Sequence, residues 1–183
     1  MRFNVSNLWI ALIASSFLVV SACEKNKVIK SVKKVSVTVD ANEATPITSG
    51  VNHIGLTVKD LEASTSFFVD TLGWKVAGGR PTYPAIFVTD GAIFVTLWQA
   101  IDPDTAIDFN RKTNVGLHHL ALNVADVETL GELHEVLKAD PNVRVEFGPQ
   151  LNGKGPTVHM MVYEPSGSRI EFAVKGGRRR GDE

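Results

Sequence analysis

Two histidines and one glutamate stand at positions of this chain where their side chains could do chemistry. His53 and His119 lie 66 positions apart, and Asp60 and Asp126 follow them at the same offset. Glu171 stands near the end of the second copy. Histidine and glutamate side chains bind divalent metal ions, and histidine also exchanges protons near neutral pH. A pattern that returns at a fixed offset indicates one supersecondary unit used twice, so the chain is predicted to carry these residues on a duplicated frame.

Strand alternation predicts which way these side chains point. Residues 53–58 and 119–124 alternate between apolar and other side chains, as half-buried strands do. Because successive side chains of a strand point to opposite faces, the apolar members should pack under helices, and His53 and His119 should lie on the opposite, open face. The same reasoning places four residues of later strands on the open face of the second copy: His159, Met161, Tyr163 and Glu171.

Each copy is predicted to fold as a βαβββ module, which makes the fold class α+β. Asp60 and Asp126 can each cap a helix, because a carboxylate accepts backbone N–H groups that are free at a helix start. Module 1 is expected over residues 51–99, a connector over 100–115 and module 2 over 116–174. The expected strands are 53–58, 74–76, 85–89 and 92–99 in module 1, and 119–124, 143–147, 158–163 and 169–174 in module 2.

Composition limits the classes of protein to consider. The chain has 183 residues, of which 44% are hydrophobic and 21% charged, so it can bury one domain-sized core. A net charge of −1 offers no general attraction for nucleic acid, and Trp74 and Trp98, which no basic patch accompanies, are interpreted as packing residues. Residues 175–183, with Arg178–Arg180, are expected to form a solvated tail.

The N-terminal residues predict export. Leu8–Val20 is apolar except for two serines and ends in Val20-Ser21-Ala22-Cys23. Such a run is typical of a cleaved signal and is short for a membrane span. Small residues before a cysteine resemble the lipobox of bacterial lipoproteins, so we expect a signal peptide at 1–22, lipid attachment at Cys23 and a tether over 23–50. The predicted location is the bacterial cell envelope, with a periplasmic or secreted protein as the alternative.

Three marks together resemble the vicinal oxygen chelate superfamily, which includes glyoxalases, extradiol dioxygenases, epimerases, fosfomycin-resistance enzymes and bleomycin-binding proteins. They are His53-Ile54-Gly55-Leu56-Thr57-Val58 with Asp60-Leu61, then His119-Leu120-Ala121-Leu122, then Glu164-Pro165-Ser166-Gly167-Ser168-Arg169-Ile170-Glu171-Phe172. The likeness covers residues 51–174. It implies a cup-shaped mixed sheet with the helices outside, in which modules pair within a chain or between two chains of a homodimer.

The resemblance also implies a metal site. His53, His119 and Glu171 match three ligand positions of the family, and the fourth position falls on Thr96 where relatives carry Glu or Gln. Gln99 could fill it only if a bulge shifted the strand. Two histidines and one carboxylate would leave about three coordination positions open on a divalent ion. The sequence does not distinguish Fe²⁺, Mn²⁺, Zn²⁺ and Ni²⁺.

Other residues of the open face receive supporting roles. His159 is the candidate general acid or base, because its ordinary pKa suits proton transfer near neutral pH. Tyr163 and Thr96 are candidates for contacts with a substrate. A structural histidine on the cup wall is the alternative for His159. His118 is expected to point away from the site, and His134 to be a surface or half-buried residue of its helix.

Two function classes follow from this resemblance. The favoured one is a metal-dependent enzyme acting on a small oxygen-chelating substrate, either a glyoxalase-like lyase or isomerase or an extradiol-type dioxygenase. The alternative is a metal-free protein that binds a drug or metabolite, as bleomycin-resistance proteins do. Such binding proteins generally lack the ligand set, so His53, His119 and Glu171 favour the enzyme. Because one fold can host many functions, the substrate stays open.

Overall fold

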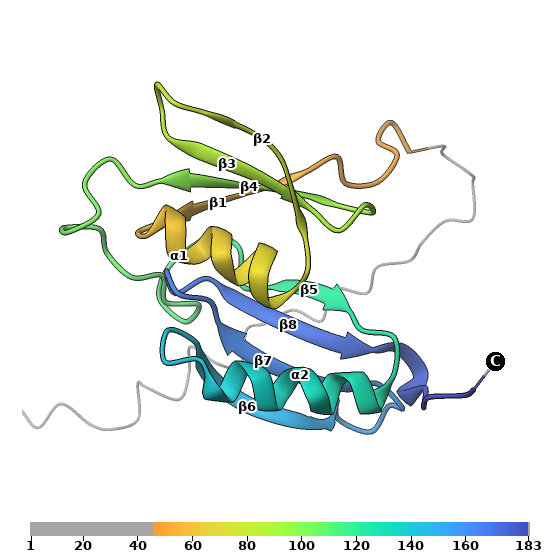
Figure 1. Ribbon diagram of the computed structural model, residues 1–183. Helices are drawn as coiled ribbons and strands as arrows, with labels where there is room; N and C mark the ends of the chain where they lie inside the picture. Colours follow the sequence, from red (N-terminus) through yellow and green to blue (C-terminus); the bar gives the residue numbers. More distant parts are fainter. Residues whose placement is uncertain (1–45, 183) are drawn as a thin grey trace, which may run out of the picture. The chain divides into compact units, whose positions relative to one another are not determined.

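A computed structural model describes residues 46–182 and shows two βαβββ modules in tandem (Figure 1). The signal at 1–22, the lipidation at Cys23 and the tether up to residue 45 lie outside the described residues. Within the described part, no helix is both long and apolar enough to cross a membrane. The α+β class with two βαβββ modules is thereby confirmed.

Module 1 forms one four-stranded sheet in the order β1-β4-β3-β2. β1 runs parallel to β4, whereas β4, β3 and β2 are antiparallel neighbours. The polypeptide between β1 and β2 forms a short α-helix that continues into a wider π-helical turn. Its elements are β1 (Ile54–Val58), α1 (Leu61–Ser66), η2 (Phe67–Thr71), β2 (Lys75–Arg80), β3 (Ala85–Thr89) and β4 (Phe94–Gln99).

Module 2 repeats this arrangement in the order β5-β8-β7-β6, with β5 parallel to β8. One regular helix, α2, packs on this sheet, mainly against β6 and also against β7 and β8 (Figure 1). Its elements are β5 (Leu120–Asn123), α2 (Val127–Ala139), β6 (Arg144–Leu151), β7 (Val158–Tyr163), β8 (Arg169–Val174) and the short turn η3 (Lys175–Gly177).

The predicted alternation decides which residues enter the core. Leu56 and Val58 of β1 are buried, while Gly55 and Thr57, which alternate with them, are exposed. In β5, Leu120 and Leu122 are buried in the same way. Apolar residues of both modules belong to one continuous core, whose burial is the main force that holds them together.

Helix starts follow the predicted caps. The carboxylate of Asp60 accepts the backbone N–H of Ala63 at 2.9 Å, and that of Asp126 accepts the N–H of Thr129 at 2.7 Å. Gly73 follows the first helical segment with a φ of 74°, a left-handed conformation that favours glycine. The sequence pattern therefore predicts where both helical segments begin and where the first one ends.

The turn between β7 and β8 ties the two modules together. Glu164 in this turn is only 1% exposed, and its carboxylate accepts hydrogen bonds from the Ser64 hydroxyl of α1 and from the backbone N–H groups of Ser166 and Ser168, at 2.6, 3.0 and 2.8 Å. The Ser166 hydroxyl accepts the N–H groups of Lys59 and Asp60 at 3.0 Å each. The first part of the third sequence motif, which begins at Glu164, thus has a structural role: it joins the two modules.

Replacing Glu164 with alanine is expected to destabilise the protein by about 3 kcal/mol, because several buried donors lose their acceptor. Urea unfolding measures this difference. Glu135→Ala is the control, since Glu135 is 70% exposed and surface substitutions change stability by about 0.5 kcal/mol or less. Equal unfolding midpoints for the two variants would contradict the structural role of Glu164.

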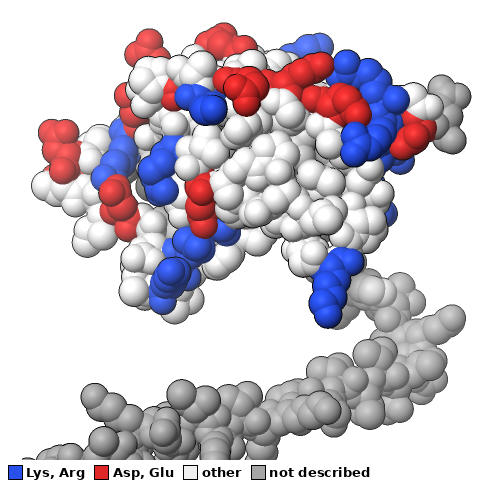
Figure 2. Space-filling model, turned by 90° about the horizontal axis from the view of Figure 1, so that it is seen from below, with Lys and Arg blue, Asp and Glu red and all other residues white. Residues whose placement is uncertain are grey.

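The C-terminal residues 178–182, expected to form a solvated tail, are exposed, and some of them hydrogen-bond to the first turn of α2. The backbone N–H of Val127 donates to the carbonyl of Arg178 at 2.9 Å, and the backbone N–H of Arg180 donates to the Glu128 carboxylate at 2.8 Å. That hydrogen bond is the main reason why the pKa of Glu128 is lowered. On the face seen in Figure 2, acidic and basic side chains are interspersed and neither sign covers the surface.

Candidate metal centre

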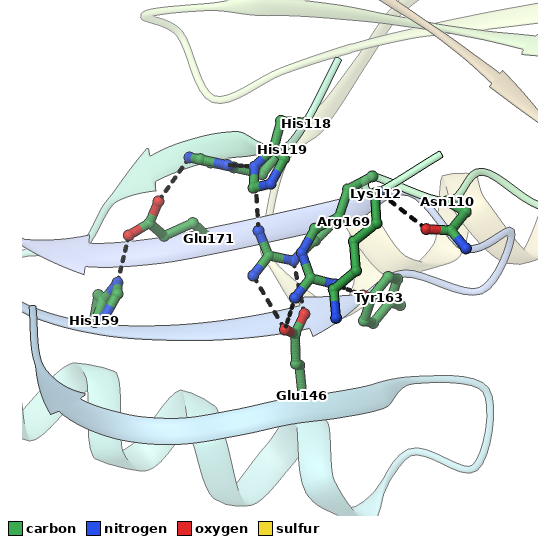
Figure 3. Close-up of polar contacts among 10 residues, drawn as sticks. Asn110, Lys112, His118, His119, Glu146, His159, Tyr163, Arg169 and Glu171 are labelled. Atoms are coloured by element: carbon green, nitrogen blue, oxygen red, sulfur yellow. Dashed lines mark hydrogen bonds and ion pairs between the residues drawn. The ribbon is translucent and has the colours of Figure 1, made fainter. Parts of the chain in front are cut away.

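Three predicted site residues meet on the open face of module 2 (Figure 3). The Nε2 atom of His119 lies 2.9 Å from one oxygen of Glu171, and Nδ1 of His159 lies 2.5 Å from the other. The register pairs Glu171 with Ala121 of β5 and Met161 of β7, as the alternation predicts. The side chains of Glu171 and His159 are 11% and 14% exposed, whereas that of His119 is 33% exposed. A ligand could therefore approach from the side of His119.

Hydrogen bonding defines which nitrogen of His159 carries a proton. A carboxylate only accepts, so Nδ1 of His159 donates to Glu171. The other ring nitrogen, Nε2, then holds a lone pair when the ring is neutral. The ring also packs against Phe147, with centroids 5.0 Å apart. These contacts fix the orientation of an imidazole that has one nitrogen left for proton transfer.

His118 occupies a position that the sequence did not predict. Its Nδ1 atom lies 2.8 Å from Nδ1 of His119 and 3.5 Å from Nη1 of Arg169. A guanidinium only donates, so Nδ1 of His118 accepts there, and Nδ1 of His119 can donate to the same atom. Nε2 of His119 faces an oxygen of Glu171 at 2.9 Å. Because a carboxylate only accepts, either a proton on Nε2 or a metal ion must lie between these two atoms.

A basic cluster lies beside this pair on the same face (Figure 3). Arg169 is 8% exposed and binds both oxygens of Glu146, through Nε at 2.6 Å and Nη2 at 3.2 Å. Arg111 of the connector donates to Glu146 at 2.9 Å and to the Tyr163 hydroxyl at 3.2 Å. The guanidinium of Arg144 stacks 3.5 Å from the centre of the Tyr163 ring. The Tyr163 side chain thus contacts two arginines, Arg111 through its hydroxyl and Arg144 through its ring.

The pKa values around this cluster follow from its charges. The hydrogen bond from Arg169 is the largest cause that lowers the pKa of Glu146. Desolvation acts to lower the pKa of Arg169, but the hydrogen bonds and charge of Glu146 outweigh it, so this pKa is raised. The pKa of His118 is lowered, first by desolvation and then by the positive charge of Arg169. Both partners of the Arg169–Glu146 pair therefore stay ionised near neutral pH.

His53 does not join this group within one chain. It is exposed, and its ring makes a hydrogen bond of 2.7 Å with Asn52, its neighbour in sequence. Among the described residues, no three or more His, Cys, Asp and Glu side chains are arranged to hold a metal ion. One chain therefore brings together two of the three predicted ligands, together with His159.

Module 1 places Thr96 and Gln99 on different faces. A Cβ built on Gly55 would lie 3.4 Å from the Thr96 hydroxyl, so Thr96 shares the open face with Gly55. Its hydroxyl accepts the indole N–H of Trp98 at 2.9 Å. The pairing of β4 with β1 and β3 has no register shift, and Gln99 instead accepts the N–H of Leu61 at the start of α1. The alternative in which a bulge makes Gln99 a ligand is not supported.

Four residues of the site were missed or dismissed from the sequence: Arg111, His118, Glu146 and Arg169. Arg169 could have been found, because it shares the phase of Glu171 on β8. Glu146 lies at a register shift between Val145 and Phe147, and such a bulge redirects a side chain in a way that alternation does not predict. His118 lies two positions before β5, where the backbone is not yet in a strand, so its direction did not follow the alternation assumed for it.

The fold and the site together define a protein of two βαβββ modules, with a histidine–carboxylate pair on an open sheet face. Residues 50–172 match the family model described as the Glyoxalase/Bleomycin resistance protein/Dioxygenase superfamily. The chain belongs to this superfamily, as the sequence motifs predict.

Individual relatives are more distant. The chain is 28% identical over 125 residues to a 2-epi-5-epi-valiolone epimerase from Actinomyces sp, covering 58% of this chain and 67% of that protein. It is 28% identical over 131 residues to a metapyrocatechase from Geobacillus stearothermophilus, covering 69% of this chain but only 37% of that protein.

Among solved structures, the chain resembles a variant of the fosfomycin resistance protein FosX from Listeria monocytogenes in complex with Mn(II). The TM-score is 0.56 at 19% identity, and the alignment covers 70% of this chain and 93% of that chain. At this level of identity the likeness concerns the fold alone. The relatives thus include enzymes of several types, and the exact reaction type is open.

Proposed function

We propose that this protein is a metal-dependent enzyme that acts on a small substrate with adjacent oxygen atoms. The observation that carries the proposal is the pairing of His119 with Glu171, in which Nε2 lies 2.9 Å from a carboxylate oxygen. These are nitrogen and oxygen donors that first-row divalent ions accept. The Mn(II) in the structure of the Listeria relative adds support from the same fold.

The residues fit a divalent ion as part of a ligand set. When bound there, the ion would act as a Lewis acid that stabilises negative charge on substrate oxygens. Glu171 would keep its second oxygen on His159 and so hold that ring beside the substrate. His159 would take or return a proton at Nε2, and Phe147 restricts the motion of its ring. Thr96 and Tyr163 remain candidates for substrate contacts.

We further propose that His53 of a second copy completes the ligand set. His53 matches His119 in the repeat and is exposed on its own chain, while the His119–Glu171 pair has only two ligands toward the ion. A homodimer that brings the open face of module 1 of one copy over module 2 of the other would supply the third ligand. The preferred partners are therefore a small substrate and a second copy of this chain.

The function is tested with the purified full chain. Bound divalent metal is measured by elemental analysis after equilibration with Fe²⁺, Mn²⁺, Zn²⁺ or Ni²⁺. Oxygen uptake with catechols and isomerisation of a hemithioacetal then separate dioxygenase chemistry from glyoxalase-like chemistry. If the chain retains none of the four ions, the metal-dependent function is wrong, and the metal-free binding protein becomes the better description.

His118 provides a finer test of the same centre. His118→Phe is expected to weaken metal binding by about 10- to 100-fold, the usual cost of losing the partner that orients a histidine ligand. His118→Gln should keep much of the affinity, because its amide oxygen can accept the Nδ1–H of His119. Competition with a chelator measures both affinities. Equal affinities for His118→Phe and for the control His134→Phe would contradict this role of His118.

We propose that the protein is exported and anchored by a lipid at Cys23. The apolar run Leu8–Val20 and the following Ser21-Ala22-Cys23 support this. In a bacterial host, the wild-type chain should incorporate labelled fatty acid and partition with membranes, and Cys23→Ala should abolish both. Cleavage without labelling would instead support a periplasmic or secreted protein.

A further inference from the structure

The open face of module 2 carries more arginine side chains than carboxylates that could neutralise them. Arg111 and Arg169 share the single carboxylate of Glu146. Arg144 stacks on Tyr163. Within residues 46–182, Arg144 has no carboxylate within ion-pair distance. Two guanidinium groups thus share one carboxylate while a third lies on the neighbouring Tyr163 ring, and like charges at close range repel one another.

The two guanidinium groups that share the Glu146 carboxylate differ in exposure and in the number of their hydrogen bonds. Arg169 is nearly buried, and three of its hydrogen atoms point to Glu146 and His118. Arg111 has 25% of its side chain exposed, and within residues 46–182 its side chain makes two hydrogen bonds, to Glu146 and Tyr163. Since a guanidinium has five N–H donors, Arg111 keeps donors for a further acceptor. The exposed Arg144 and the neighbouring Lys112 add charge without an ion pair of their own among the described residues.

The cluster lies at a fixed and short distance from the proposed metal centre. Arg169 and Glu171 are two positions apart on the same face of β8, a separation of about 7 Å along a strand. His118 connects them, because it contacts both Arg169 and His119. Figure 3 shows Arg169, Glu146 and Tyr163 grouped beside the two histidines and Glu171. One small molecule could therefore reach both places.

We propose that Arg111 and Arg144, supported by Arg169, bind an anionic group of the substrate, so that the substrate is a small acid with separate chelating oxygens. The identification of the chelating end rests on the proposed function, whereas the anionic end rests on this cluster alone. A carboxylate matches the paired donors of a guanidinium and would offset the surplus charge. Neutral diols and ketones would lack this contact.

Two probes that differ only in a carboxylate test the proposal: catechol and 3,4-dihydroxybenzoate. Their affinities for the Mn²⁺-loaded full chain are measured by calorimetry. The acid is expected to bind at least about 10-fold more tightly, as for a charge-assisted hydrogen bond. Arg111→Gln and Arg144→Gln should each remove most of this preference. Lys138→Gln on α2 removes the same charge outside the cluster and should keep it.

Separate outcomes distinguish this inference from the proposed function. Metal content and catechol binding report on the metal centre, while the ratio of the two affinities reports on the anionic subsite. The ratio is also measured on chelator-treated protein, where a preference for the acid would support the subsite without a metal. Equal affinities for both probes, with and without metal, would overturn the inference, as would a preference that survives both arginine substitutions. Unchanged unfolding midpoints confirm that the variants remain folded.

Discussion

Glu171→Gln is expected to lower the metal affinity of this protein by more than about 100-fold, since losing even an outer partner of a ligand costs 10- to 100-fold. Glutamine keeps the size of the side chain but removes the negative charge that balances a divalent ion. The Glu171 side chain is 11% exposed and lies between His119 and His159, so water would replace it poorly. Elemental analysis and chelator competition measure the effect.

The same substitution should also affect proton transfer. The charged oxygen that now accepts the Nδ1–H of His159 at 2.5 Å becomes part of a neutral amide, which is a weaker acceptor. Glu135→Gln is the matched control, because Glu135 is 70% exposed and its ion pair among the described residues is with the half-buried His134, away from the site. Metal content that stays at the wild-type level in Glu171→Gln would show that Glu171 is not a ligand.

The parts of the centre that lie on regular strands could be predicted from the sequence. The bounds of β7 and β8 agree with the expected strands 158–163 and 169–174, because alternation between apolar and polar residues specifies both a strand and its buried face. This places Glu171 and His159 on one face and makes them neighbours. The prediction works where backbone geometry alone decides the direction of a side chain.

Other parts depend on contacts that periodicity does not encode. Glu146 reaches the arginines because β6 has a register shift beside it, and Arg111 reaches them from the connector. The first helix was expected as one regular segment, yet Phe67–Thr71 forms a π-helical turn. That turn places both Phe67 and Phe68 in the core, with at most 1% exposure each, so tertiary packing prevails over the regular helical period.

The relation between His53 and His119 was the least predictable feature. The repeat shows that the two residues are equivalent, but equivalence in sequence does not say whether two open faces meet within one chain or between chains. In the described residues, the His119–Glu171 pair forms without His53. A second copy is therefore the proposed source of the missing ligand, and an experiment on mixed dimers can separate the two arrangements.

Mixing a His53→Ala chain with a His119→Ala chain is expected to restore metal binding that neither variant has alone. In a mixed dimer, one site combines His53 of the second variant with His119 and Glu171 of the first, so all three ligands are intact. The other site lacks both histidines. Mixed dimers isolated with two different affinity tags should hold half as much metal as wild-type dimers.

The control mixture combines His119→Ala with Glu171→Gln. His119 and Glu171 lie 2.9 Å apart in one chain, so each site takes both from the same copy and no mixed dimer of these variants can have an intact site. Restoration in the first mixture alone would place His53 and the His119–Glu171 pair on different chains. If the sites formed within single chains, neither mixture would recover metal, because each chain would keep its own defect.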